Sequence, residues 1–142
     1  YSAEGYLTGI VENIDDTEYS STSLTYENGD ITSISSKMNG LENKFIYEPG
    51  EESSTYHLPC LGLLEIHPLT FHIEALYAGL LGKDPRHFTI HSCPAGSNDE
   101  NTVYSYGFDK KGNPSRMICQ TTYAGGQASY YPYTRNISVS FE

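Results

Sequence analysis

The sequence has no tryptophan and few basic residues, and the second shortage excludes a class of partner. Its 142 residues include eight Lys and Arg against eighteen Asp and Glu, which gives a formal net charge of −10. Nucleic-acid binding requires clustered basic side chains that displace counterions from phosphates. The densest basic pair, Lys110-Lys111, follows Asp109 in a predicted turn. We therefore expect no nucleic-acid partner.

Cysteine and long apolar runs are also scarce. Cys60, Cys93 and Cys119 form no CxxC pair. Their odd number allows at most one intramolecular disulfide and leaves one thiol over, and three free thiols are the alternative. No apolar run approaches the roughly 20 residues that a membrane-spanning helix needs. No signal peptide is recognisable, but the chain begins at Tyr1 instead of Met, so this absence excludes nothing.

Catalytic and metal-binding motifs are missing as well. The sequence contains no GxSxG, no HExxH, no P-loop and no EF-hand loop. If residues 87–93 form a strand, His87 and His91 lie about 13 Å apart, too far for one metal ion. Pro68 separates His67 from His72, and His57 stands alone. We therefore predict no metal site and no cofactor.

Two weaker possibilities remain among the polar residues. Cys93 with His87 or His91 is the best thiol–base pair for a hydrolase, although Pro94 argues against a helix N-terminus that would activate the thiol. Asp15-Asp16 and the loop 97–101 have the oxygen atoms for a weak calcium site, but acidic loop residues are more often simply solvated. Neither pattern identifies a catalytic residue.

What the sequence does contain favours β-structure, with thirteen tyrosines and many serines and threonines. Asn28-Gly29 and Asn39-Gly40 are two-residue turns between apolar runs, because both residue types tolerate positive φ. The stretch FDKKGNPSRMI (108–118) has the same aromatic-acid-glycine order as YENGDITSI (26–34), so it is a hairpin corner and not a ligand loop. We predict hairpins within 23–35 and 37–54, and strands over 5–13, 87–93, 102–109, 115–122 and 135–141.

One segment differs from this strand-like sequence pattern. Apolar residues recur at helical spacing over 69–81, Gly82 is placed as a helix-ending glycine, and Pro85 prevents the helix from continuing. The predicted fold is therefore a single α+β domain over 1–142. It is mainly β, with a twisted antiparallel sheet of hairpins and one central helix (69–81) packed on one face.

Two stretches resemble a known family. ALYAGLLGKDPRHF (75–88) and VYSYGFDKKGNPSRM (103–117) are similar to an uncharacterised family of secreted Bacteroidetes lipoproteins with aromatic-Asp-x-x-Gly hairpins. The resemblance covers about Leu24 to Phe141. It implies a β-rich domain at the outer membrane or cell surface, attached through a lipid-bearing cysteine upstream of Tyr1. It brings no catalytic residues.

The functional prediction is a noncatalytic extracytoplasmic module of a cell-surface lipoprotein, with a binding or scaffolding role. A small extracytoplasmic hydrolase using His, Cys or acidic residues is the alternative. The loop TYAGGQASYYPY (122–133) suits a glycan or a surface protein, because tyrosine offers a flat apolar face with a hydroxyl. The expected binding residues are Tyr123, Tyr130, Tyr131 and Tyr133. Inward packing of Tyr130 and Tyr133 is the competing interpretation.

Overall fold

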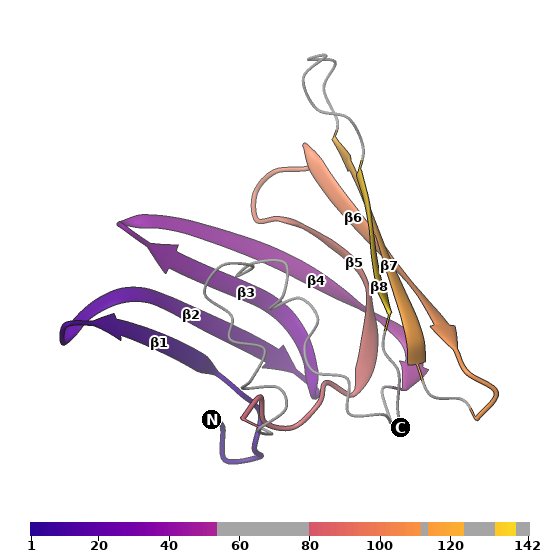
Figure 1. Cartoon of the computed structure of the whole chain (residues 1–142), viewed down its shortest axis with the longest axis horizontal. Coiled ribbons are helices and arrows are strands. Elements are labelled where there is room, and N and C mark those ends of the chain that lie inside the picture. Colours follow the sequence, from indigo (N-terminus) through magenta and orange to yellow (C-terminus); the bar gives the residue numbers. More distant parts are fainter. Residues whose placement is uncertain (54–79, 112–113, 124–132, 139–142) are drawn as a thin grey trace.

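Consecutive strands of the chain pair side by side in one antiparallel sheet. The computed structural model describes residues 1–53, 80–111, 114–123 and 133–138. Within these ranges the sheet has eight strands in the order β1 to β8. They are β1 (Gly9–Ile14), β2 (Thr17–Glu27), β3 (Asp30–Met38), β4 (Leu41–Ser53), β5 (His87–Pro94), β6 (Glu100–Phe108), β7 (Pro114–Tyr123) and β8 (Tyr133–Ser138). The sheet is strongly bent, since β1–β4 form one half and β6–β8 rise steeply from it beyond β5 (Figure 1).

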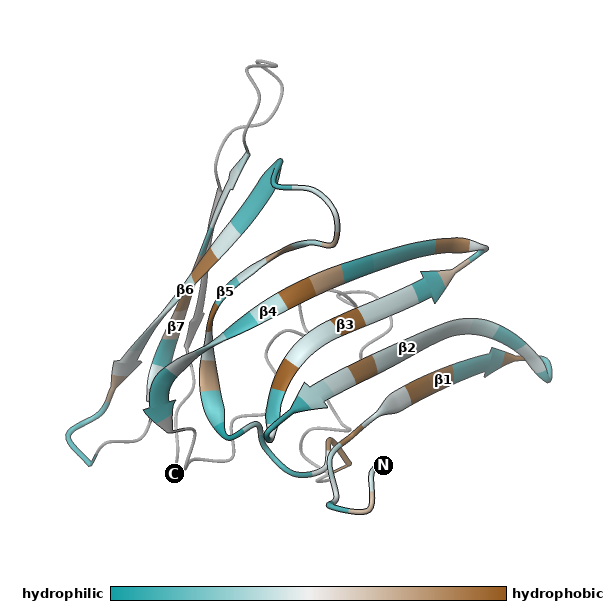
Figure 2. Cartoon of the chain, turned by 180° about the vertical axis from the view of Figure 1, so that it is seen from behind, coloured by the Kyte–Doolittle hydropathy of each residue, from teal (hydrophilic) through white to brown (hydrophobic). Residues whose placement is uncertain are grey.

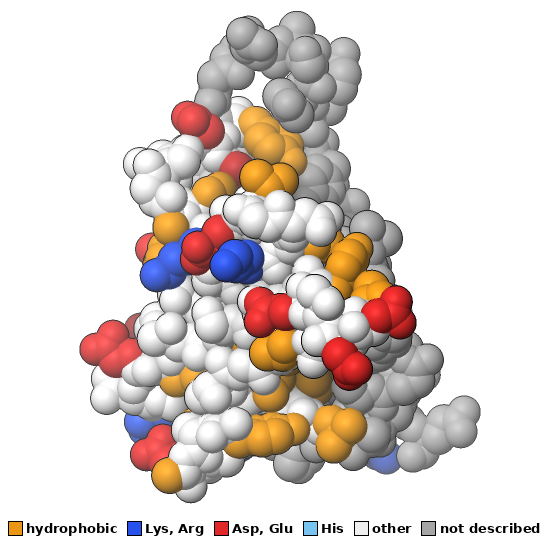
Figure 3. All heavy atoms as spheres, turned by 90° about the vertical axis from the view of Figure 1, so that its left-hand side faces the viewer, with side chains coloured by type: hydrophobic (Ala, Val, Ile, Leu, Met, Phe, Trp, Pro, Cys, Tyr) orange, Lys and Arg blue, Asp and Glu red, His pale blue; other side chains and the backbone are white. Residues whose placement is uncertain are grey.

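The first three hairpins have two-residue turns with left-handed backbone. Asn28-Gly29 has φ values of 53° and 90°, and Asn39-Gly40 has 51° and 77°. Both turns were predicted, and both are confirmed. Asp15-Asp16 forms the third such turn, with φ of 49° and 62°, which the sequence analysis treated as a polar loop. Figure 3 views the molecule from the side of the β1–β2 and β3–β4 turns, where acidic side chains are prominent.

Alternation along the strands separates an inner face from an outer face. Leu24, Ile34 and Phe45 are register partners on the inner face, and the first two are buried. Figure 2 shows hydrophobic segments side by side in β2, β3 and β4. One core cluster lies here, and a second lies on β6 and β7. The buried members are Leu7, Leu24, Ile31, Ile34 and Tyr47 in the first and Tyr104, Met117 and Cys119 in the second.

The inner face also buries hydroxyl groups. Thr102 and Thr121 are register partners whose hydroxyls lie 2.8 Å apart, and Ser92 bonds the Tyr104 hydroxyl at the same distance. Because each polar group has a partner, burial leaves none of these four unsatisfied. A serine or threonine in a strand of this protein can therefore face the interior as well as water.

The predicted α+β class is wrong. Every regular element in the described part of the chain is a strand. No helix long and apolar enough to cross a membrane is found among these residues. Residues 69–79 of the predicted helix lie outside the described residues. Its last two residues, Leu80 and Leu81, form a turn, and Leu80 is 57% exposed. Periodicity alone does not separate a short apolar helix from a buried strand, so helical spacing did not specify a helix here.

The segment after this turn lies against the N-terminus. Tyr6 forms an antiparallel bridge with Gly82, whose φ of 73° has the sign expected for a helix-ending glycine. Glycine is required at position 82 for a different reason: a Cβ there would lie 2.7 Å from the Gly5 carbonyl oxygen. Lys83 sits over the Tyr6 ring, which stacks on Tyr26 with centroids 4.8 Å apart. The two segments together cover the β2–β3 turn.

Gly29 and Gly40 allow a controlled test of the contact between Tyr6 and the β2–β3 turn. Both occupy the second position of a left-handed turn, where alanine costs about 1–2 kcal/mol. A Cβ at Gly40 would meet nothing within 4 Å, whereas one at Gly29 would lie 2.8 Å from the buried Tyr6 hydroxyl oxygen. Gly29→Ala should therefore lower the free energy of unfolding by about 1 kcal/mol more than Gly40→Ala. Equal losses in urea unfolding would show that Tyr6 does not pack on the turn.

Candidate functional site

The structure places two of the four predicted binding tyrosines, Tyr123 and Tyr133, and both lie at one end of the sheet. Tyr123 is the last residue of β7 and pairs with Glu100, and Tyr133 begins β8 opposite Thr121. Tyr123 is half-buried and already has an interaction partner. Tyr130 and Tyr131 lie outside the described residues. The binding role of all four remains a prediction.

A shallow hollow lies next to the strand end that carries Tyr123. It measures about 280 Å³ and is lined by Ile46, Cys93, Pro94, Gly96, Ser97 and Asn98. Ile46 and Cys93 are register partners on the outer face of β4 and β5, and Pro94 is the last residue of β5. Gly96, Ser97 and Asn98 belong to the turn into β6. That turn ends at Glu100, the partner of Tyr123. Tyr123 shares the inner face with the buried Thr121 and Cys119, whereas Ile46 and Cys93 line the hollow from the outer face.

The turn that lines the hollow is held in place by its own hydrogen bonds. The Ala95 N–H donates to the Lys44 carbonyl at 2.8 Å, which ties the turn to β4. The Asn101 amide donates to the Asn98 carbonyl at 2.9 Å, and the Asp99 N–H donates to the Ser97 hydroxyl at 3.1 Å. A ligand would thus meet a preformed surface, which lowers the entropy cost of binding.

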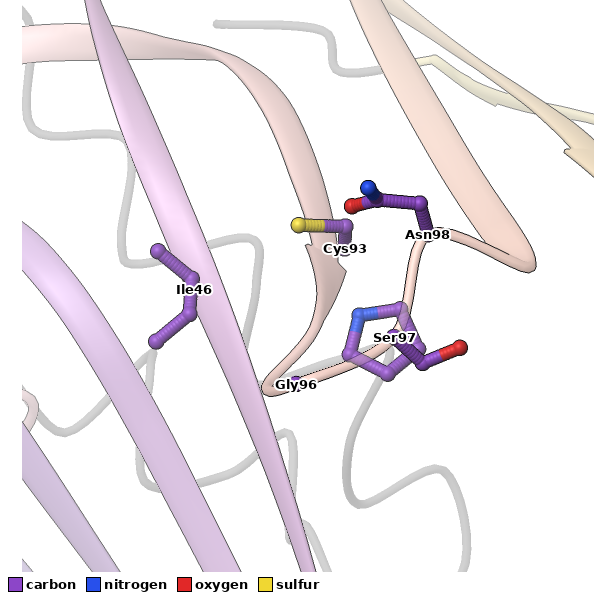
Figure 4. A pocket seen from close by; sticks show the side chains of 6 residues that line it. Ile46, Cys93, Gly96, Ser97 and Asn98 are labelled. Atoms are coloured by element: carbon purple, nitrogen blue, oxygen red, sulfur yellow. The ribbon is translucent and has the colours of Figure 1, made fainter.

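The side chains that line the hollow carry no formal charge at neutral pH. Ile46 and Pro94 provide an apolar wall, while the amide of Asn98 has no hydrogen-bond partner among the described residues. In Figure 4 the Cys93 thiol points toward Ile46, and the Asn98 amide extends toward Cys93. An open amide beside an apolar wall suits a neutral ligand with hydroxyl or amide groups.

The histidines take structural positions. The buried carboxylate of Asp30 accepts the His87 N–H at 2.7 Å and lies 2.8 Å from the His87 Nδ1. The Arg86 N–H donates to the Gly29 carbonyl at 2.9 Å. The start of β5 is therefore fastened to the β2–β3 turn by three contacts, although 57 residues separate Asp30 from His87 in sequence.

His91 lies on the outer face between two polar partners. Its Nδ1 is 3.4 Å from a Glu48 carboxylate oxygen, and its Nε2 is 3.2 Å from the Asn101 side-chain oxygen. The Asn101 NH₂ group donates to the Asn98 carbonyl, which fixes the orientation of the amide. Both ring nitrogens are thus engaged across β4, β5 and β6, beside the hollow.

The thiol–base pairs considered for a hydrolase are not assembled. His87 and Cys93 are six residues apart on β5, about 20 Å at the rise of a strand. His91 faces Glu48 and Asn101 rather than Cys93, and His57 lies outside the described residues. Neither Cys93 nor Cys119 forms a disulfide with another described residue; the first is half-buried on the outer face and the second is buried on the inner face. In the described ranges, no three His, Cys, Asp or Glu side chains converge as a metal site.

The described residues form an all-β, antiparallel sheet, and comparison with other proteins places the chain in a family. Residues 1–116 match DUF4595, a domain of unknown function with porin-like fold, and the chain belongs to that family. The resemblance to an uncharacterised domain family is thereby confirmed in its general form, while the lipoprotein and hairpin details remain predictions.

A solved structure supports the same fold. The chain is similar to a porin-like protein from Bacteroides uniformis ATCC 8492, with 26% sequence identity and a TM-score of 0.78. The match covers 96% of this chain and 54% of the other, so this chain spans about half the length of that protein. Among curated proteins, none matches.

Asp30→Ala tests whether the contact between the β2–β3 turn and β5 stabilises the fold. Removing the buried carboxylate leaves the His87 N–H without its acceptor, and we expect a loss of about 1–3 kcal/mol in the free energy of unfolding. Glu27→Ala is the matched control, because Glu27 is the exposed register partner of Asp30 in the same hairpin. Urea unfolding of both variants, with His87→Ala and the double variant, measures the coupling. Equal effects of Asp30→Ala and Glu27→Ala would exclude a stabilising contact.

Proposed function

We propose that the chain is a noncatalytic binding module of an extracytoplasmic, cell-surface lipoprotein, and that it holds a neutral glycan at the hollow lined by Ile46, Cys93 and Asn98. The observation that carries this proposal is the preformed hollow with its open Asn98 amide. Hydroxyl groups of a sugar match such an amide, and the apolar face of a sugar ring matches Ile46 and Pro94.

The predicted tyrosine residues are a second part of the proposed site. Tyr123 pairs with Glu100, the first residue of β6 after the turn that lines the hollow. Aromatic rings beside amide groups provide both stacking and hydrogen bonding at low entropy cost. Tyr130, Tyr131 and Tyr133 would extend the surface contributed by Tyr123.

The outer face of the sheet supports attachment by a lipid anchor instead of burial of the strands in lipid. Lys37, Glu42 and Lys44 lie there on β3 and β4, all exposed, together with Ser33 and Ser35. Charged side chains are costly in an apolar environment. This surface therefore faces water, and an anchor upstream of Tyr1 would hold the domain at the membrane. The porin-like relative from Bacteroides agrees with a location at the outer membrane or cell surface.

A hydrolase is less well supported. The described histidines are occupied by Asp30, Glu48 and Asn101, and none of them faces a thiol. A binding or scaffolding role needs no such group, because affinity arises from shape and hydrogen bonding alone.

Asn98→Ala tests the proposed site against a panel of immobilised neutral oligosaccharides. Loss of the amide should weaken binding about tenfold, the equivalent of one or two hydrogen bonds, while the melting temperature stays unchanged because the side chain is exposed. Asn13→Ala is the control, since it removes an exposed asparagine from β1, at the other side of the sheet.

Tyr131→Ala should also reduce retention on the same panel without changing the melting temperature. If the wild-type chain binds no oligosaccharide but is retained by a surface-protein fraction, the ligand class is a protein. Identical binding by the wild type and Asn98→Ala would show that the hollow is not part of the binding site.

A further inference from the structure

The hollow brings an apolar surface and an open amide together, and this combination is more selective than neutrality alone. Ile46 and Cys93 come from adjacent strands, and Asn98 comes from the turn into β6. In Figure 4 the Cys93 thiol points toward Ile46, and the Asn98 amide extends toward Cys93. A ligand that fills the hollow therefore meets an apolar surface and a polar group side by side.

The apolar part suits a small group without hydrogen-bonding atoms. Ile46 is 37% exposed, so part of its side chain still faces water. The Cys93 thiol behaves as a small, polarisable apolar group, and Pro94 has no N–H to donate. A sugar hydroxyl placed against these side chains would lose hydrogen bonds to water without replacement. A methyl group placed there loses none, and it removes apolar surface from water.

The polar part can both donate and accept hydrogen bonds. The Asn98 amide carries an oxygen acceptor and two N–H donors. No hydrogen-bond partner occupies it among the described residues, while the Asn98 backbone carbonyl accepts the Asn101 amide at 2.9 Å. A ligand group that pairs with Asn98 and also covers the apolar part needs hydrogen-bonding atoms next to a methyl group. A plain sugar hydroxyl has no such methyl group.

Charge favours a neutral group over an acidic one. Asp99 follows Asn98 and is exposed, and no basic side chain lines the hollow. A sugar carboxylate would be repelled by Asp99 and by a chain whose formal net charge is −10. A sugar ammonium group would be attracted to Asp99, but it would lose water against the apolar side chains. An ammonium sugar is therefore a necessary comparison.

We propose that the hollow binds the acetamido group of an N-acetylated neutral sugar, with the methyl group against Ile46 and Cys93 and the amide hydrogen-bonded to Asn98. This inference rests on the glycan-binding function proposed above and names its ligand class. The hollow measures about 280 Å³, just below the roughly 300–1,000 Å³ of small-molecule sites. It therefore suits one sugar substituent, and the rest of the sugar chain stays outside.

Three tetrasaccharides of the same linkage that differ only at the second carbon of each sugar test the ligand class. They carry an acetamido, a hydroxyl or an ammonium group, as in oligomers of N-acetylglucosamine, glucose and glucosamine. Titration calorimetry of the wild-type chain should show about tenfold tighter binding of the acetamido ligand than of either other ligand, because only this group matches both parts of the hollow. Tightest binding of the ammonium ligand would overturn the proposal.

Substitutions in each part of the hollow locate the contact. Asn98→Ala and Ile46→Thr should each remove most of the preference for the acetamido ligand, and threonine keeps the β-branched shape that suits a strand. Val103→Thr is the matched control, because it makes a similar change at an exposed residue of β6 that does not line the hollow. An unchanged preference in Asn98→Ala and Ile46→Thr, or an equal loss in Val103→Thr, would contradict binding at the hollow.

Labelling of the Cys93 thiol by a maleimide reports where the acetyl group lies. The experiment uses a Cys60→Ser background, since Cys60 lies outside the described residues, and Cys119 is completely buried. At ten times the dissociation constant of the acetamido ligand only about one chain in eleven is free, so labelling should slow about tenfold. An unchanged rate would show that the acetyl group lies elsewhere.

The outcomes separate this proposal from the glycan-binding function on which it rests. Equal binding of the acetamido and hydroxyl ligands, weakened equally by Asn98→Ala, would overturn the acetamido contact and leave the glycan function standing. No binding of any neutral oligosaccharide would overturn both. A peptide with an acetylated lysine carries the same acetamido group without a sugar, and binding of this peptide alone would show that the ligand is a protein.

Discussion

The left-handed two-residue turn is the constraint on which the rest of the sheet depends. Three such turns join β1 to β4 and set the register of the strand pairs next to them. The register then shifts by one residue at Glu12/Asn13 between β1 and β2 and at Thr25/Tyr26 between β2 and β3. Because side chains alternate along a strand, that register decides which residues face the core. A shift by one residue would move Leu24 and Ile34 to the outer face and bring Ser23 and Ser35 inward.

Contacts distant in sequence then determine how the two halves of the sheet meet. The buried Asp30 carboxylate joins the β2–β3 turn to the start of β5, and the Tyr6–Gly82 bridge covers the same turn from the N-terminal side. Further along, paired hydroxyls such as Thr102 and Thr121 sit in the interior without an unsatisfied group. Such polar contacts require one arrangement of neighbouring strands, because any other would leave a buried donor or acceptor unpaired.

The hollow shows how this framework could serve recognition. Its wall comes from adjacent strands, and its polar group, Asn98, comes from a turn that hydrogen-bonds both to β4 and within itself. A rigid sheet that holds exposed turns is a common basis for binding sites. The DUF4595 family match and the porin-like relative support the fold of this framework.

The sequence by itself determined the hairpins at Asn28-Gly29 and Asn39-Gly40 and the strand character of 87–93 and 115–122, since turn chemistry and strand propensity act over a few residues. It also indicated the left-handed Gly82, but for a helix that the described residues do not contain. Only the tertiary structure decided that Asp15-Asp16 closes a hairpin, that Asp30 bonds His87, and that Ile46, Cys93 and Asn98 line one hollow. These contacts depend on which strands become neighbours, and pairing between distant segments leaves no local pattern in the sequence.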